Sequence, residues 1–242
     1  MTPSLSPRYE RHRNLKGFGV EGQQKLKDSR VLVVGAGGLG SPVLYYLAAA
    51  GVGTLGICDG DVVEESNLNR QILHGVGTLG VTKVDSAADR LENLNPELNI
   101  LRYPVRVLDH NVEKMLAGWD LVLDCTDNFD ARFCISDGCQ RNHMPLIEAG
   151  VNGWEGLVLP LFTREGPCYR CLFPSVPANV EKGPPVIGVA AGLTGAIMAQ
   201  EAIRFLLGLP QQPGTLFRID GFKGKTHRLQ WPKRENCRGC NT

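Results

Sequence analysis

The chain has 242 residues, and its composition of 43% hydrophobic and 21% charged residues is ordinary for a globular domain with a sizeable core. A formal net charge of +1 gives no global attraction to nucleic acid or to an anionic membrane, so neither is expected as a partner. The N-terminus lacks the charged-then-apolar pattern of a signal peptide, and polar residues interrupt the longest apolar segment, residues 186–209. These features argue against secretion and a membrane span, and they predict a cytoplasmic protein.

The first 29 residues are polar and include a short amphipathic helix at about residues 21–27. A basic cluster precedes that helix and consists of Arg8, Arg11, His12 and Arg13. Composition alone favours a solvated surface for this cluster.

The next stretch, residues 30–71, has the order of a nucleotide-binding unit. Arg30–Val34 is a β-branched apolar run typical of a buried parallel strand, and GAGGLG at residues 35–40 follows it directly. A helix at about residues 41–50 and a second strand at residues 54–59 come next. The G-x-G-x-x-G spacing lets the backbone approach a phosphate closely, and Asp59 ends the second strand, where a carboxylate usually accepts ribose hydroxyls.

Two cations follow Asp59 where the chain returns to the same edge of the predicted sheet. A polar connection, residues 60–71, carries Arg70, and Lys83 lies in the first turn of a helix expected at about residues 81–93. The helix dipole disfavours a cation in that turn, so Lys83 is expected to be either solvated or held by an external anion.

Strands and helices then continue to alternate. Strands are predicted at residues 98–105, 121–124 and 145–149, and helices at residues 112–117 and 129–142. This alternation predicts an α/β, Rossmann-like fold, with a mostly parallel sheet and helices on both faces. The glycine loop, Asp59 and Asp127 all follow strand ends, so we expect them to converge on one crevice.

Beyond Gly150 the pattern changes to antiparallel strands at residues 156–162 and 215–229, which flank a long helix at residues 189–207. Residues 173–188 read as an irregular, proline-rich loop. We therefore expect one domain, residues 1–242, with an N-terminal helical arm (1–29), a nucleotide-binding core (30–150) and a C-terminal elaboration (151–242).

The eight cysteines argue for a metal site. Four form two C-x-x-C pairs, Cys168/Cys171 and Cys237/Cys240, and in a chain without a secretion signal such pairs favour zinc over disulfides. Four thiolates give zinc a closed tetrahedral set, so a structural, non-catalytic site with about one zinc per chain is predicted. A thioredoxin-like redox role would use one pair and leave the other unexplained. The other cysteines are expected to pack in the core: Cys58, Cys125, Cys134 and Cys139.

The most common use of G-x-G-x-x-G with a distal acid is an NAD site, which would make the protein an oxidoreductase. Arg70 and Lys83 supply more positive charge than a dinucleotide needs, whereas a triphosphate needs it. Asp127, at a strand end, is placed to hold Mg²⁺, which usually completes its coordination with substrate phosphates. Together these features favour ATP.

Several longer motifs resemble the MoeB/ThiF family, bacterial relatives of the ubiquitin-activating enzymes. They are RYER at residues 8–11, the stretch from residue 35 to 71 that ends in SNLNRQ, DCTDN at residues 124–128, and the two C-x-x-C pairs. The resemblance covers nearly the whole chain. It implies ATP-dependent adenylation of the C-terminal glycine of a ubiquitin-like sulfur-carrier protein that ends in Gly-Gly, ahead of thiocarboxylate formation in molybdopterin or thiamine biosynthesis. It also implies that residues 151–242 bind the carrier.

The resemblance assigns roles residue by residue. Gly38 matches the phosphate loop and Asp59 the ribose-binding acid. Three residues match contacts to the ATP phosphates: Asn67, Arg70 and Lys83. Asp127 matches the acid beside Mg²⁺ and the reacting centre, with Asn128 next to it. Arg11 matches an arginine that reaches the phosphates from the partner subunit of a homodimer, which replaces the solvated-surface interpretation for this one residue.

The chain departs from some family members in one respect. Those members bond covalently to the carrier through a cysteine in the loop before the long helix, but residues 174–183 contain none. The chain also ends soon after Cys240, so we expect it to stop at the acyl-adenylate and to rely on a separate sulfur donor. The absence of a cysteine from this loop favours a MoeB-like member of the family.

Other functions stay open at this point. The same ATP site could act on a different acceptor, as in a tRNA-modifying dehydratase or a peptide adenylator, although a tRNA substrate is disfavoured by the lack of a basic surplus. An NAD oxidoreductase is disfavoured by Arg70, Lys83 and Asp127. A catalytically silent subunit is disfavoured because every ATP-contacting position is filled.

Overall fold

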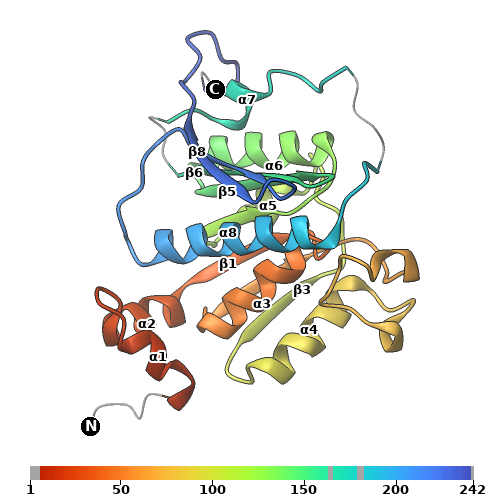
Figure 1. The fold of residues 1–242 in the computed structure, drawn as a ribbon, viewed down its shortest axis with the longest axis vertical. Coiled ribbons are helices and arrows are strands. Elements are labelled where there is room, and N and C mark those ends of the chain that lie inside the picture. Colours follow the sequence, from red (N-terminus) through yellow and green to blue (C-terminus); the bar gives the residue numbers. More distant parts are fainter. Residues whose placement is uncertain (1–5, 163–165, 179–182, 241–242) are drawn as a thin grey trace.

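The structure is a computed structural model that describes residues 6–162, 166–178 and 183–240. Its centre is an eight-stranded sheet with the strand order β3-β2-β1-β4-β5-β6-β7-β8 (Figure 1). The first five strands pair in parallel and the last three are antiparallel. The predicted fold class, a mostly parallel Rossmann-like sheet with C-terminal antiparallel strands, is therefore confirmed.

The parallel strands are β1 (Arg30–Val34), β2 (Thr54–Cys58), β3 (Asn99–Tyr103), β4 (Leu121–Asp124) and β5 (Leu146–Asn152). The antiparallel strands are β6 (Glu155–Leu161), β7 (Thr215–Asp220) and β8 (Lys225–Gln230). The strand expected at residues 215–229 is thus a hairpin of two strands, because residues 221–224 form a turn.

Helices cover both faces of the sheet, as expected. One core cluster packs α3 (Gly40–Ala50), α4 (Lys83–Leu94) and α8 (Gly188–Leu206) against alternate residues of the strands. A second cluster packs α5 (Val112–Leu116) and α6 (Phe129–Asn142) against the other face. The short helix α7 (Tyr169–Leu172) adjoins α6 in a third cluster. Helix α4 begins at Lys83 rather than residue 81 because the hydroxyl of Thr82 caps it, accepting from the amide of Asp85.

The N-terminal arm consists of the 3-10 turn η1 (Pro7–Tyr9) and the helices α1 (Glu10–Arg13) and α2 (Gly19–Asp28). Two hydrogen bonds fix this arm. The hydroxyl of buried Tyr9 accepts from Asn95 Nδ2 at 3.0 Å, and Gln23 Nε2 donates to the Ala50 carbonyl at 2.9 Å. Ala50 ends α3 and Asn95 is the C-cap of α4, so these anchors place the arm at the end of the sheet opposite the glycine loop (Figure 1).

Two further 3-10 turns, η2 (Glu65–Asn67) and η3 (Val76–Thr78), lie in the connection between β2 and α4. In the parts of the chain that the structure describes, no helix combines the length and the apolar character that crossing a bilayer requires.

Two glycines of the G-x-G-x-x-G loop, Gly35 and Gly40, are required for steric reasons alone. Gly35 has φ +96°, a left-handed conformation that favours glycine, and a Cβ on Gly40 would lie 1.9 Å from the Gly35 carbonyl oxygen. By contrast, a Cβ on Gly38 would meet nothing closer than the Ala191 Cβ, at 3.4 Å. The fold therefore dictates Gly35 and Gly40, whereas a Cβ at position 38 would make only ordinary contacts.

Candidate active site

A cavity of about 1340 Å³ opens at the carboxyl ends of the parallel strands. Six of the residues singled out from the sequence line it together: Gly38, Asp59, Arg70, Lys83, Asp127 and Asn128. They come from the loops after β1, β2 and β4 and from the start of α4. The expected convergence on one crevice is thus present in the structure.

Asp59 braces the glycine loop from the end of β2. Its Oδ2 accepts from the Ala36 amide at 2.8 Å, and its Oδ1 accepts from the Asp61 amide at 2.9 Å. The carboxylate is only half-buried, so each oxygen keeps a lone pair that a ligand hydroxyl can use.

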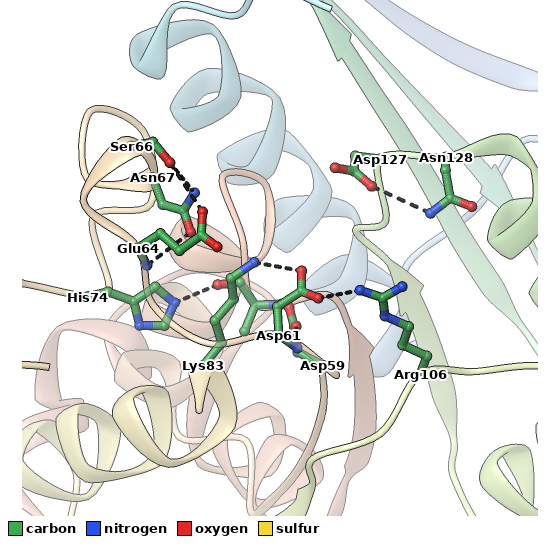
Figure 2. Close-up of polar contacts among 11 residues, drawn as sticks. Asp59, Asp61, Glu64, Ser66, Asn67, His74, Lys83, Arg106, Asp127 and Asn128 are labelled. Carbon is green, nitrogen blue, oxygen red and sulfur yellow. Dashed lines mark hydrogen bonds and ion pairs between the residues drawn. The ribbon is translucent and has the colours of Figure 1, made fainter. Parts of the chain in front are cut away.

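Lys83 has a partner that neither sequence interpretation anticipated. It is 7% exposed, and its Nζ lies 3.1 Å from Oδ2 of Asp61, while Arg106 Nη2 lies 2.7 Å from Oδ1 of the same carboxylate. Figure 2 shows Lys83 and Arg106 reaching Asp61 from opposite sides. Burial would raise the pKa of Asp61, but the hydrogen bonds from Arg106 and Lys83 outweigh it and hold that pKa below its usual range. An internal carboxylate therefore holds the lysine.

Sequence reasoning missed Asp61 and Arg106. Asp61 stands only two residues after Asp59, and Arg106 follows the end of β3, a neighbouring parallel strand. The same rule about strand ends that selected Asp59 would have selected both.

His74 was also missed, and it locks the glycine loop to α4. Its Nε2 donates to the Ala36 carbonyl at 2.8 Å, so its Nδ1 accepts from the Ser86 hydroxyl at 2.8 Å. Burial lowers the pKa of His74 and keeps the ring neutral near pH 7. The histidine is a fixed part of the scaffold.

Asn67 and Arg70 occupy the connection after Asp61. Arg70 lines the cavity, and its Nη1 donates to the Ser66 carbonyl at 3.0 Å and to Asn69 Oδ1 at 2.9 Å. Asn67 is buried, and its amide contacts the Ser66 hydroxyl at 3.3 Å and the Glu64 amide at 3.4 Å. Its side chain shapes η2, and among the described residues it is not one that lines the cavity.

Asp127 and Asn128 lie across the cavity from Lys83 (Figure 2). Asp127 is exposed, and among the described residues its one short polar contact is with Asn128 Nδ2 at 3.4 Å. Asn128 caps α6, because its Oδ1 accepts from the Ala131 amide at 2.9 Å. Asp127 therefore offers a free carboxylate to a ligand, and Asn128 has a structural role besides its place in the cavity wall.

Arg11 does not reach this cavity within one chain. It is exposed on α1, at the opposite end of the sheet, and it is not among the described residues that line the cavity. A contribution from Arg11 would therefore require a second copy of the chain.

The four paired cysteines meet in one place. The sulfur atoms of Cys168, Cys171, Cys237 and Cys240 all lie within 4.8 Å of one another, and three of the four residues are buried. The nearest pairs, Cys168–Cys237 and Cys171–Cys240, are 3.5 Å apart, which is close to the edge of a tetrahedron built on zinc–sulfur bonds of about 2.3 Å. The donor set and its geometry fit a structural zinc ion.

Three other cysteines line the cavity: Cys58, Cys125 and Cys134. Burial raises the pKa of Cys58 and of Cys134 to about 12, and it also raises that of Cys125. All three thiols are therefore poor nucleophiles near neutral pH. Cys58, Cys125 and Cys139 are buried, as core packing requires, and Cys134 is half-buried. Residues 179–182 of the cysteine-free loop lie outside the described residues.

Comparison with known proteins places the chain in a family. Residues 9–239 match the model of the ThiF family. The chain is 39% identical over 241 residues to the adenylyltransferase and sulfurtransferase MOCS3 of Xenopus laevis. This match covers 97% of this chain and 53% of that relative. It is 45% identical over 197 residues to the adenylyltransferase and sulfurtransferase UBA4 of Saccharomyces cerevisiae (strain YJM789), covering 79% of this chain and 44% of that relative. The chain spans about half the length of these curated relatives.

Solved structures share the fold. E. coli MccB with MccA-N7isoASN superposes with a TM-score of 0.88 at 22% identity, over 100% of this chain and 76% of that one. E. coli MccB with ATP gives a TM-score of 0.83 at 22% identity, over 96% of this chain and 76% of that one.

Proposed function

The chain belongs to the ThiF family, and we propose that it adenylates the C-terminal glycine of a ubiquitin-like sulfur-carrier protein, using ATP. One observation carries the proposal above the others: a single cavity contains the glycine loop, Asp59, the two cations Arg70 and Lys83, and the free carboxylate of Asp127. The family and the relatives named as adenylyltransferases support the same reaction.

The chemistry needs little from the protein beyond charge and geometry. A C-terminal carboxylate has an ordinary pKa of about 3.3–3.7, so it is ionised near neutral pH and needs no general base. One of its oxygens attacks the α-phosphorus of ATP and forms the new P–O bond. The bond from that phosphorus to the oxygen bridging the α- and β-phosphates breaks, and pyrophosphate leaves with the electron pair. The product is the acyl-adenylate.

The residues of the cavity would relieve the repulsion between these anions. Asp59 would accept the ribose hydroxyls while it continues to brace the Ala36 amide. Arg70 and Lys83 would stabilise negative charge on the phosphates, with Asn67 shaping the connection that carries Arg70. Gly38 has no side chain, so its backbone can approach a phosphate. Arg11 would complete the site from the partner subunit of a homodimer.

Asp127 fits a magnesium ion, because it is an exposed carboxylate in the cavity whose one polar contact within the described part of the chain is a weak one, to Asn128. When bound, Mg²⁺ supplies charge neutralisation to the phosphates of the substrate. The four cysteines would hold Zn²⁺ with no open position, so this ion would have a structural role.

The acceptor is the finer part of the proposal. A carrier ending in Gly-Gly presents a flexible terminal carboxylate to the cavity, and residues 151–242 would bind its folded part. Thiocarboxylate formation would follow with sulfur from a separate donor in the cytoplasm, as part of molybdopterin or thiamine biosynthesis. The cysteine-free loop, residues 174–183, favours the molybdopterin type. A tRNA or a peptide acceptor is the second candidate for this ATP site.

ATP–pyrophosphate exchange tests the proposal. The purified protein is assayed alone and with a set of small ubiquitin-like proteins that end in Gly-Gly. We expect exchange with at least one carrier and none without a carrier. Exchange in the absence of any carrier, or none with every carrier tried, contradicts the proposal.

A further inference from the structure

Two acidic side chains are buried side by side beneath the Asp127 loop. Asp124 of β4 and Glu148 of β5 are direct partners in the register of these parallel strands, and they are 0% and 1% exposed. Like charges on neighbouring strand positions repel, and a buried carboxylate is costly unless it is paired. The proposed reaction uses neither group, so the arrangement needs another explanation.

Arg132 of α6 reaches this pair from above the sheet. Its side chain is 13% exposed, and its Nε lies 3.6 Å from Oε1 of Glu148. Gly150 makes room for the guanidinium, because a Cβ there would lie 3.2 Å from Arg132 Nη1. Tyr169, from α7, is buried close enough to the guanidinium that the positive charge of Arg132 opposes the rise that burial causes in the pKa of the tyrosine hydroxyl.

The same arginine holds the backbone next to Asp127. Its Nε and Nη2 donate to the Thr126 carbonyl at 3.2 and 2.8 Å, and Oδ1 of Asp124 accepts from the Thr126 amide at 2.8 Å. Both backbone polar groups of Thr126 are therefore held by the buried charges. Asp127 is the next residue, and α6 begins two residues later with Phe129.

The charges of the cluster balance when Glu148 keeps its proton. Burial and the neighbouring Asp124 raise the pKa of Glu148 far above its usual range, against the opposing effect of Arg132. Neither oxygen of Glu148 accepts a hydrogen bond from the described residues, and a proton lets this group donate to Asp124. The result is one carboxylate and one guanidinium with a neutral carboxyl group between them.

We propose that Arg132, seated by Asp124, Glu148 and Tyr169, is a positioning residue that fixes the Thr126 peptide and thereby orients the Asp127 carboxylate toward the phosphates. This inference rests on the proposed adenylation. Arg132 itself touches no reacting atom in this scheme. Its effect passes through the Thr126 carbonyl.

The test is Arg132→Lys, which keeps a buried positive charge but loses the planar pair of donors. Arg141→Lys is the matched control, because Arg141 lies on the same helix but pairs with Glu113 on the surface. We expect Arg132→Lys to lower kcat roughly 10- to 100-fold, with the KM for ATP changed by less than about threefold. The control should leave both values unchanged.

Hydrogen exchange of backbone amides gives a readout that needs no substrate. We expect faster exchange at residues 126–131 in Arg132→Lys, with unchanged exchange in α3 and unchanged zinc content. Glu148→Gln should behave like the wild type, since an amide can replace the neutral carboxyl group, whereas Glu148→Leu should reproduce the loss of kcat and the faster local exchange.

The outcomes separate the two proposals. An unchanged kcat together with unchanged local exchange in Arg132→Lys overturns the positioning role, and so does a uniform rise in exchange through the whole sheet, which indicates a general loss of stability. If the wild type shows no exchange of pyrophosphate with any carrier, the proposed function fails, and the amide exchange at residues 126–131 still decides whether Arg132 holds the loop.

Discussion

The Nζ of Lys83 lies 3.1 Å from the Asp61 carboxylate, which also forms an ion pair with Arg106 at 2.7 Å. Lys83 is almost fully buried, and a buried cation without a counter-charge is costly. Asp61 supplies that charge, and the backbone amide of Lys83 also donates to the Asp61 carbonyl at 2.9 Å. These two contacts therefore fix the orientation of the Lys83 side chain in the cavity before any ligand binds.

The first prediction concerns this pair and pH. The pKa of Asp61 is lowered in the folded protein, so its ionised form stabilises the fold above the ordinary aspartate pKa of 3.8. That contribution should be lost as the pH falls below 3.8 toward the lowered value. Asp61→Asn should thus reduce the free energy of unfolding more at pH 7 than at pH 3. Urea titrations of both proteins at the two pH values measure this, and an equal difference at both would contradict it.

The second prediction separates the two uses of glycine in the phosphate loop. A Cβ at position 38 makes only ordinary contacts, so Gly38→Ala should keep the wild-type Tm while raising the KM for ATP by roughly 10-fold or more. A Cβ at position 40 would collide with the Gly35 carbonyl at 1.9 Å, so Gly40→Ala should cost more than about 2 kcal/mol of stability.

Thermal unfolding and steady-state kinetics of the two variants decide the matter. A Gly38→Ala protein with normal ATP kinetics would remove Gly38 from the nucleotide site. A stable Gly40→Ala protein would contradict the steric account of the loop.

The third prediction is about one zinc per chain, bound by the four clustered cysteines. Elemental analysis after purification without chelator measures the stoichiometry. Removing the ion should cost about 3 kcal/mol and lower the Tm by roughly 6–12 °C, because the cluster ties residues 237–240 to α7. A Cys237→Ser variant should show the same lowered Tm. Four free thiols and no metal in the untreated protein would disprove the site.

The elements that position the site could be predicted from the sequence because their signals are local. The valine-rich run at Arg30–Val34 and the helix at Phe129–Asn142 have the predicted bounds. The cluster of four cysteines was also predictable, because two C-x-x-C pairs in one chain are expected to meet at a shared metal site.

Residues defined by contacts between distant segments could not be predicted in this way. Lys83 was expected to be solvated or bound to an external anion because the helix dipole disfavours a cation in the first turn. The position of Asp61 after a strand end does not by itself show that its carboxylate contacts Lys83. The pairing of Asp124 with Glu148 depends on the register of β4 and β5, which becomes visible only once the sheet is formed. The hydrophobic pattern of the sequence identified the strands, but it did not show which side chains of neighbouring strands lie next to each other.

Pyrophosphate exchange by Asp127→Ala tests the central claim most directly, that this cavity activates a carboxylate with ATP. Asp127 is exposed, and its short polar contact with the residues that the structure describes is with Asn128 alone, so its removal should leave the Tm unchanged. In the presence of a carrier that supports exchange by the wild type, we expect Asp127→Ala to reduce exchange by at least about 100-fold. A variant that folds normally and still exchanges pyrophosphate at the wild-type rate would contradict the account.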